Sequence, residues 1–384
     1  MRSFEFVNPV KILFGRGQIA SLGREIPRRA RILMVYGGGS IKRNGVYEQV
    51  KKALAGRTLK EFAGIEPNPR TETLLQAVEL VRREKLNFLL AVGGGSVLDG
   101  TKFIAAAVHF RGDPWDIVAK GAAVNKAVPL GAVVTLPATG SEMNPFAVIS
   151  NSATQEKLPF MSPQVFPRFS VLDPEVTFSL PRRQISNGIV DAFAHVLEQY
   201  MTFPVNAPLQ DRMAEAILQT LVEEGPKTLG DPTDYDSRAN LMWCATLALN
   251  TLIAAGVPED WSAHMIGHEI TALHGLDHAQ TLAIVWPALL EVRREAKREK
   301  LLQYAERVWK LTSGSPEERT AAAIARTRAF FEEVGVPTRL SAYGLGPDTA
   351  AVVAERLEKR GWIAMGERRD ITPAVVRQIL AAAR

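Results

Sequence analysis

The feature that most constrains the fold is a change in the pattern of secondary structure near residue 180. Before it, short β-rich runs alternate with helical stretches, an order typical of a mostly parallel sheet with helices on its faces. After Leu180-Pro181, long amphipathic or apolar stretches follow one another without a convincing strand. The runs expected as strands are Ile32–Tyr36, Phe88–Val92, Gly131–Leu136 and Ser170–Leu172, with helices expected at Val46–Ala55 and Val97–Val108. The later helices are expected at 184–201, 206–224, 235–254, 258–274, 280–290, 296–311, 316–334, 347–360 and 372–383.

The length of the chain supports a division at the same place. Its 384 residues exceed the ~250–300 at which a single core stops growing, so two domains are expected. We predict an α/β domain over residues 1–180, with a Rossmann-like, mostly parallel sheet, followed by an all-helical domain over residues 181–384.

The composition excludes several classes of protein. Glu5 and Pro9 interrupt the region where an export signal needs an unbroken apolar stretch, and Cys244 has no second cysteine to pair with, so we expect a cytoplasmic protein. The longest uncharged run, Leu241–Val257, is shorter than the ~20 residues of a membrane span, which favours a buried helix. Although the net charge is +5, the basic stretch Glu291–Lys300 interleaves glutamates with its cations, as a solvated surface helix does. Neither nucleic acid nor a membrane is expected as a partner.

Two of the expected strands run directly into the tetrapeptide Gly-Gly-Gly-Ser, at 37–40 and at 93–96. Without Cβ atoms the backbone can approach a pyrophosphate, and the helix that follows directs N–H groups and its positive dipole end at the anion. Neither unit is the GxGxxG fingerprint, and tight turns that bind nothing also use glycine. Because two such units follow strands in a chain that also has a histidine cluster, dinucleotide binding is the favoured interpretation.

The residues after the first of these units indicate which dinucleotide is bound. NAD-preferring sites commonly place a carboxylate after a strand to accept a hydrogen bond from the ribose 2′-hydroxyl, and that carboxylate would repel a 2′-phosphate. No acid occurs from Gly37 to Gly45, whereas Ser40, Lys42 and Arg43 do, so NADP(H) is expected. The alternative is that Lys42 and Arg43 are only exposed helix residues.

Five of the six histidines fall between residues 195 and 278. Asp191 and His195 are four residues apart, which places a carboxylate and an imidazole on one helix face, a spacing suited to holding a divalent metal. An ordinary Asp–His hydrogen bond would use the same spacing. This pair alone therefore does not identify a metal site.

A second group of histidines comprises His264, His268, His274 and His278. Along one unbroken helix His264 and His278 would stand about 21 Å apart, too far to share one ion. Both can bind only if the helix ends between them, and Gly275 is a suitable stop. The spacing equally permits His264 with His268, or His274 with His278, so the residues alone leave the ligand set open.

Several ordered motifs resemble one known family. GGGSVLDGTK (93–102), LPATGSE (136–142), VLDP (171–174), the Asp191/His195 pair and the block from His264 to His278 are together similar to the iron-containing alcohol dehydrogenases. Within that family the chain resembles the bacterial NADPH-dependent aldehyde reductase, or butanol dehydrogenase-like, branch. The resemblance runs from residue 12 to the C-terminus. It implies a metal-dependent, NADP(H)-linked enzyme that reduces short- to medium-chain aldehydes to primary alcohols, on the two-domain plan shared with dehydroquinate synthase.

The resemblance also implies roles for individual residues. It assigns the metal, Fe²⁺ or Zn²⁺, to Asp191, His195, His264 and His278, and leaves His274 near the site without being a ligand. His268 is left available for proton handling as the catalytic residue. The implied cofactor contacts are Gly38 and Ser40 at the 2′-phosphate, Gly94, Gly95 and Ser96 at the pyrophosphate, and Asn68, Thr135, Thr139, Asn144 and Lys157 elsewhere along the dinucleotide.

Other interpretations remain to be distinguished. A lyase similar to dehydroquinate synthase shares the two-domain plan, but it needs several basic residues gathered for a substrate phosphate and a different metal set. A glycerol dehydrogenase-like polyol oxidoreductase and a nucleotide-sensing or metal-stabilised binding protein are the further alternatives. We also expect a homodimer, in which Ser3–Val7 forms a strand that pairs across the dimer edge.

Overall fold

In the computed structural model, which describes residues 1–384, the chain divides into two compact units. One comprises Val7–Leu180 and Pro232–Thr246, and the other comprises Met1–Phe6, Pro181–Asp231 and Leu247–Arg384. One boundary between the units lies between Leu180 and Pro181. Two short segments are exceptions to a single division there: Met1–Phe6 packs with the later, helical unit, and Pro232–Thr246 packs with the earlier one. We retain the division after residue 180 as our proposal for the domain boundary, with these two segments contributed across it.

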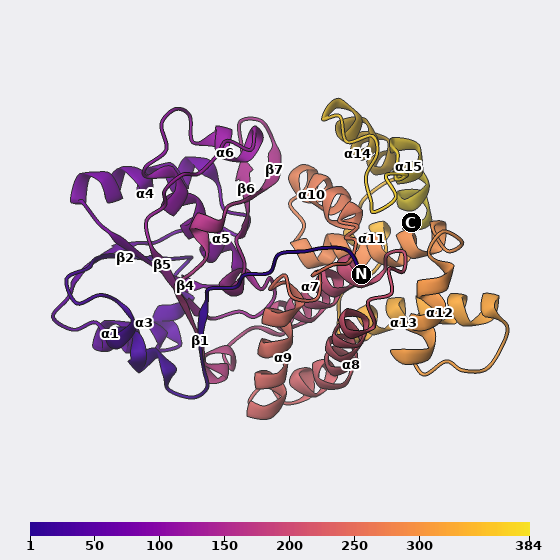
Figure 1. The fold of residues 1–384 in the computed structure, drawn as a ribbon, viewed down its shortest axis with the longest axis horizontal. Helices are drawn as coiled ribbons and strands as arrows, with labels where there is room; N and C mark the ends of the chain where they lie inside the picture. The colour runs from indigo at the N-terminus through magenta and orange to yellow at the C-terminus, as the bar shows by residue number, and fades with distance from the viewer. The chain divides into compact units, whose positions relative to one another are not determined.

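The first unit is built on a sheet of six parallel strands in the order β1-β8-β5-β4-β2-β3. Figure 1 labels β1, β2, β4 and β5 of this sheet. A separate antiparallel hairpin, β6-β7, lies outside this sheet. The strands are β1 (Lys11–Phe14), β2 (Arg31–Tyr36), β3 (Thr58–Phe62), β4 (Phe88–Gly93), β5 (Leu130–Val134), β6 (Phe146–Asn151), β7 (Glu156–Met161) and β8 (Phe169–Leu172).

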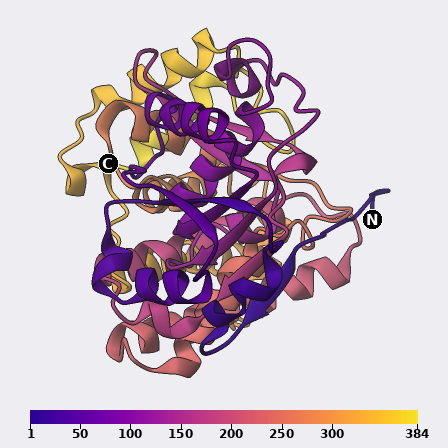
Figure 2. The same ribbon diagram turned by 90° about the vertical axis from the view of Figure 1, so that its left-hand side faces the viewer.

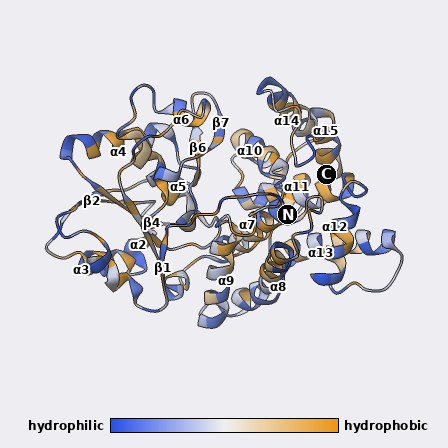
Figure 3. Ribbon diagram, viewed as in Figure 1, coloured by the Kyte–Doolittle hydropathy of each residue, from blue (hydrophilic) through white to orange (hydrophobic).

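Helices cover both faces of this sheet, which explains why its central strands are hydrophobic throughout. Every residue of β4 is buried, and alternate side chains of β2 and β4, such as Met34 and Leu90, pack in one core with α1 and α3. The sheet carries hydrophobic colouring in Figure 3, whereas α3 and α4 are partly hydrophilic, as surface helices are. The helices of this unit are α1 (Leu22–Glu25), α2 (Ser40–Arg43), α3 (Val46–Ala53), α4 (Thr71–Glu84), α5 (Gly95–Ala107) and α6 (Trp115–Ala119).

The second unit consists of helices, and each stretch expected as a helix after residue 180 contains one. The predicted fold class, a mostly parallel sheet domain followed by an all-helical domain, is confirmed. No helix of the chain is long and apolar enough to span a bilayer. The helices are α7 (Arg182–Tyr200), α8 (Pro208–Gly230), α9 (Tyr235–Ala248, most of which packs with the first unit), α10 (Ser262–His274), α11 (His278–Val292), α12 (Arg298–Arg307), α13 (Pro316–Glu333), α14 (Asp348–Lys359) and α15 (Pro373–Ala382).

Within one chain, Ser3–Val7 lies in the segment without strand or helix that precedes β1 (Figure 2), and its pairing across a dimer edge stays a prediction. Two local predictions were wrong. The run Leu241–Val257 is not one helix, because α9 ends at Ala248 and the Asn250 side chain accepts the Leu252 N–H in a turn. The stretch Glu291–Lys300 is divided between α11 and α12, with Lys297 and Lys300 buried.

Candidate metal centre and cofactor site

One face of α7 carries two of the four residues expected to bind metal. Asp191 and His195, one helical turn apart, are both buried, as is most of α7. Burial lowers the pKa of His195 to about 4, so this imidazole is neutral at pH 7 and has a lone pair for a metal.

The other two residues lie in the first turns of α10 and α11. Gly275 adopts the left-handed conformation (φ 72°) that ends α10, and Asp277 then begins α11 through a capping box with Gln280. This break removes the separation that one continuous helix would impose between His264 and His278. The expectation that Gly275 ends the helix is confirmed.

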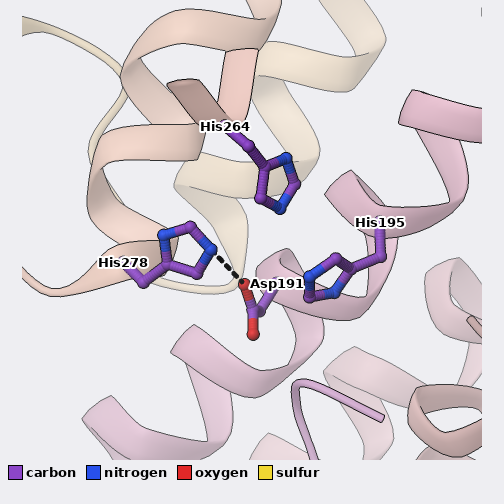
Figure 4. A group of neighbouring side chains, drawn as sticks. All are labelled: Asp191, His195, His264 and His278. Carbon is purple, nitrogen blue, oxygen red and sulfur yellow. Dashed lines mark ion pairs between the residues drawn. The ribbon is translucent and has the colours of Figure 1, made fainter. Parts of the chain in front are cut away.

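The four side chains converge on one point, as Figure 4 shows. One donor atom from each of Asp191, His195, His264 and His278 lies within 4.8 Å of the others. The Nε2 atom of His278 is 3.7 Å from Oδ1 of Asp191. Donors about 2.1 Å from a tetrahedral ion lie about 3.5 Å from one another, so small side-chain movements would close this set around one metal. One carboxylate and three imidazoles suit Fe²⁺ or Zn²⁺.

Two further rings border the cluster without belonging to it. The His268 ring, buried on α10, lies 5.2 Å from the His278 ring between centroids. Trp261 meets the His264 ring edge-on at 5.0 Å. His274 is exposed at the end of α10 and does not take part in the cluster. The structure therefore places His268 beside the candidate metal centre, where its proton could be used.

Sequence reasoning missed two acidic residues that hold the ligand-bearing helices. Glu198 is buried on α7, and Oε1 of its carboxylate lies 2.6 Å from Nδ1 of His264. Asp277 accepts hydrogen bonds from Arg183 (2.6 Å) and Asn187 (2.7 Å), also on α7. The signal for Glu198 was present, since it lies seven residues after Asp191 on the same helix face within a largely apolar helix.

Burial raises the pKa of the Glu198 carboxyl well above its usual range, and the nearby Asp260 raises it further. The backbone N–H groups of His264 and Trp261 act in the opposite direction. A divalent cation bound to His264 would also favour the carboxylate form, because it adds positive charge close by.

The residues expected to bind the cofactor lie in the first unit. Gly38 and Ser40 follow β2, Gly94 follows β4, and Gly95 and Ser96 begin α5, so the two glycine units stand at the carboxyl ends of neighbouring strands. Asn68 has a left-handed backbone (φ 58°), and its N–H donates to Ser96 Oγ. Thr135 follows β5, and its N–H donates to the carbonyl of Gly93. Asn144 and Lys157 are buried on or beside the β6-β7 hairpin.

The two glycine units differ in the space around them. A Cβ on Gly38 would meet no atom within 4 Å, and the same holds for Gly39, which has φ of 90°. A Cβ on Gly95 would lie 2.4 Å from Cγ2 of Thr139. Only glycine at this position therefore allows the loop that contains Thr139 to lie so close to the start of α5. The N–H groups of Gly95 and Ser96, at the start of a 13-residue helix, have no partner within that helix and suit a phosphate. The glycine unit at residues 37–40 leads only into the four-residue α2, whose dipole is weaker than that of α5.

A buried polar network, which the sequence did not predict, supports the loop before β6 that contains Asn144. The Nζ atom of Lys102, with no solvent exposure, donates to Ser141 Oγ (2.8 Å), to the backbone and side-chain oxygens of Asn144 (2.9 and 3.0 Å) and to the carbonyl of Phe146 (2.7 Å). Asp99 accepts from Ser141 Oγ at 2.7 Å. Burial lowers the pKa of Lys102 to about 8. This lysine therefore fixes the position of the Ser141–Phe146 segment.

We expect Lys102→Met to lower the free energy of unfolding by about 3–5 kcal/mol, because it removes the cation with the larger effect on the buried Asp99 and the donor to the oxygens of the Ser141–Phe146 segment. Lys52→Met, at an exposed position in the same unit, is the matched control and should change it by less than about 0.5 kcal/mol. Urea denaturation of both variants measures the difference. Equal stability of the two variants would contradict a supporting role for Lys102.

Comparison with known proteins identifies the family. The model of the iron-containing alcohol dehydrogenases matches residues 9–174, and that of the C-terminal domain of the Fe-containing alcohol dehydrogenase family matches residues 185–383. The chain belongs to the iron-containing alcohol dehydrogenase family. The family resemblance inferred from the motifs is thus confirmed.

Individual iron-containing alcohol dehydrogenases align with the chain from end to end. The NADPH-dependent aldehyde reductase YqhD of Escherichia coli K12 is 58% identical over 387 aligned residues that cover 100% of both proteins. The crystal structure of E. coli K-12 YqhD superimposes with a TM-score of 0.99, covering 100% of this chain and 99% of that one. NADH-dependent butanol dehydrogenase A of Thermotoga maritima gives a TM-score of 0.96 at 35% identity, with 100% and 99% covered.

Proposed function

We propose that the chain is a metal-dependent, NADP(H)-linked alcohol dehydrogenase that reduces short- to medium-chain aldehydes to primary alcohols. The observation that carries this proposal is the convergence of Asp191, His195, His264 and His278 on one point. The chain's 58% identity to an NADPH-dependent aldehyde reductase supports the substrate class and the direction.

Different residues of the chain would bind the metal, bind the cofactor and donate the proton. Asp191, His195, His264 and His278 would hold the metal, and the N–H groups of Gly95 and Ser96 would bind the pyrophosphate. When bound, the metal supplies a Lewis acid for the aldehyde oxygen and NADPH supplies the hydride. His268, buried beside His278, would donate the proton that completes the alcohol, directly or through a water that it holds.

The first glycine unit supports NADPH over NADH. No carboxylate occurs from Gly37 to Gly45, and Ser40 is there to bind a phosphate. The Thermotoga relative is described as NADH-dependent, so membership of the family does not determine the cofactor. The preference is therefore inferred from these residues and from the NADPH-dependent E. coli relative.

We expect Gly38→Asp to raise the KM for NADPH by about tenfold or more and to change the KM for NADH much less. A Cβ at residue 38 would meet no atom within 4 Å, so the backbone has room for a side chain there, and the charge of an aspartate would repel a 2′-phosphate. Gly38→Asn is the matched control, since it has the same shape without the charge. Equal effects of Asp and Asn on NADPH would contradict the placement of the 2′-phosphate beside Gly38.

The function is tested by following the absorbance of NADPH at 340 nm with butanal as substrate. Oxidation of NADPH by the metal-loaded protein, lost after treatment with a chelator and restored by Fe²⁺ or Zn²⁺, is the expected result. A lyase or a nucleotide-binding protein would leave NADPH unchanged, and a polyol oxidoreductase would prefer glycerol with the oxidised cofactor. Metal analysis of the purified protein distinguishes iron from zinc, and light scattering tests the predicted homodimer.

A further inference from the structure

A single buried carboxylate, that of Glu198, holds the first turn of α10. Its Oε2 atom accepts the Trp261 N–H at 2.6 Å, and its Oε1 atom accepts the His264 N–H at 3.1 Å. Oε1 also lies 2.6 Å from Nδ1 of the His264 ring. Glu198 has no solvent exposure, so these bonds are not in competition with water.

The start of α10 depends on these bonds. Trp261, the N-cap, has a left-handed backbone (φ 61°) and offers no capping side chain. The N–H groups of a first turn have no partners within the helix, and here Glu198 and Asp260 provide acceptors. Glu198 thus sets the position of both the backbone and the ring of His264.

The bond to Nδ1 determines which ring nitrogen of His264 can bind a metal. A carboxylate accepts a hydrogen bond from Nδ1–H, and in that tautomer the lone pair is on Nε2. Figure 4 shows the other ring nitrogen of His264 turned toward Asp191, His195 and His278. Carboxylates that orient metal-binding histidines in this way typically contribute 10–100-fold in metal affinity.

We propose that Glu198 is a positioning residue of the metal centre, which fixes the ring orientation and the tautomer of His264 so that Nε2 binds the ion. The inference rests on the metal site of the proposed function but not on the reaction. Glu198 is not one of the four donors of the cluster, and in this role it acts on the ion through His264.

Neighbouring contacts keep Glu198 in place independently of the ion. The Nζ atom of Lys297 donates to Asp260 Oδ2 (2.7 Å), to the carbonyl of Met201 at the end of α7 (2.7 Å) and to Glu367 (2.9 Å). The Asp260 N–H in turn donates to the carbonyl of Glu198. The end of α7 and the start of α10 are therefore joined before any metal binds.

The test compares Glu198→Gln with Glu223→Gln, an exposed position on α8 of the same unit. Glutamine keeps the size of the side chain but removes the charge. Metal affinity is measured by competition between a chelator and the metal-loaded protein, without substrate. We expect Glu198→Gln to weaken Zn²⁺ binding by about 10–100-fold and to alter the visible spectrum of the Co²⁺-substituted protein, whereas Glu223→Gln changes neither.

The outcomes separate a positioning role from a structural one. A lower melting temperature with unchanged metal affinity would reduce Glu198 to a helix cap and overturn the proposal. Because the Glu198 variant could fail to fold, ¹⁵N-histidine NMR of the unaltered zinc-loaded protein gives a second measurement. A protonated Nδ1 on His264, slow to exchange with solvent, is expected, and coordination through Nδ1 would overturn the proposal. Loss of affinity in Glu198→Gln would support it even if the enzyme did not reduce aldehydes.

Discussion

Replacing His264 with alanine is expected to abolish metal retention and aldehyde reduction together. His264 supplies one of four donors within 4.8 Å of one another, and three donors hold an ion far less tightly. Lewis-acid stabilisation of the transition state is worth several kcal/mol, so kcat/KM falls by about 10³-fold or more. Metal content of the purified variant and its rate with butanal and NADPH are measured side by side.

The control for this variant is His109→Ala, in the other unit and outside the cluster, which should retain both metal and activity. The result that counts against the proposed centre is a His264→Ala protein with a full complement of metal. Full activity without metal would instead remove the Lewis acid from the mechanism. The two readouts therefore test the site and the chemistry separately.

Replacing His268 with glutamine is expected to lower kcat by about 10²–10⁴-fold and to leave the metal content unchanged. The residue borders the cluster, with its ring 5.2 Å from that of His278, but it is not one of the four donors. Glutamine preserves much of the size and polarity of the side chain while removing a group that can give up a proton near neutral pH.

This effect is measured as kcat for butanal reduction over a range of pH, with His109→Gln as the control. If His268→Gln keeps the full kcat at every pH, the proton comes from elsewhere. If the variant also loses its metal, His268 supports the centre structurally and the catalytic assignment is wrong. Retained metal with reduced kcat is the combination that supports a proton donor.

The helices after residue 180 could be predicted because their apolar positions repeat with the helical period over many residues. Two edge strands could not. β3, with the sequence Thr-Leu-Lys-Glu-Phe, is partly exposed at one edge of the sheet, and the four-residue β1 lies at the other. The hairpin β6-β7 was also missed, because it stands outside the main sheet and does not fit the alternation of strands and helices.

The candidate ligands could be nominated from residue type, but their grouping could not be derived from spacing. Gly275 showed where a helix could end, whereas the direction in which His278 points depends on how α11 packs against α7. The position of Glu198 on the Asp191 face of α7 was visible in the sequence, but its contact with His264 was not, since 66 residues separate the two. Contacts of this kind leave no local pattern in the sequence, because each partner alone is an ordinary residue of its helix.

The arrangement along α7 limits how the length of this protein can change. One side of this helix carries all the residues involved. Arg183 and Asn187 hydrogen-bond to Asp277. Donor atoms for the metal would come from Asp191 and His195, and Glu198 holds His264. An amino acid inserted in the middle of α7 would turn everything beyond it by about 100° around the axis. Insertions and deletions should therefore accumulate in the connecting loops, while the number of residues in α7 stays constant.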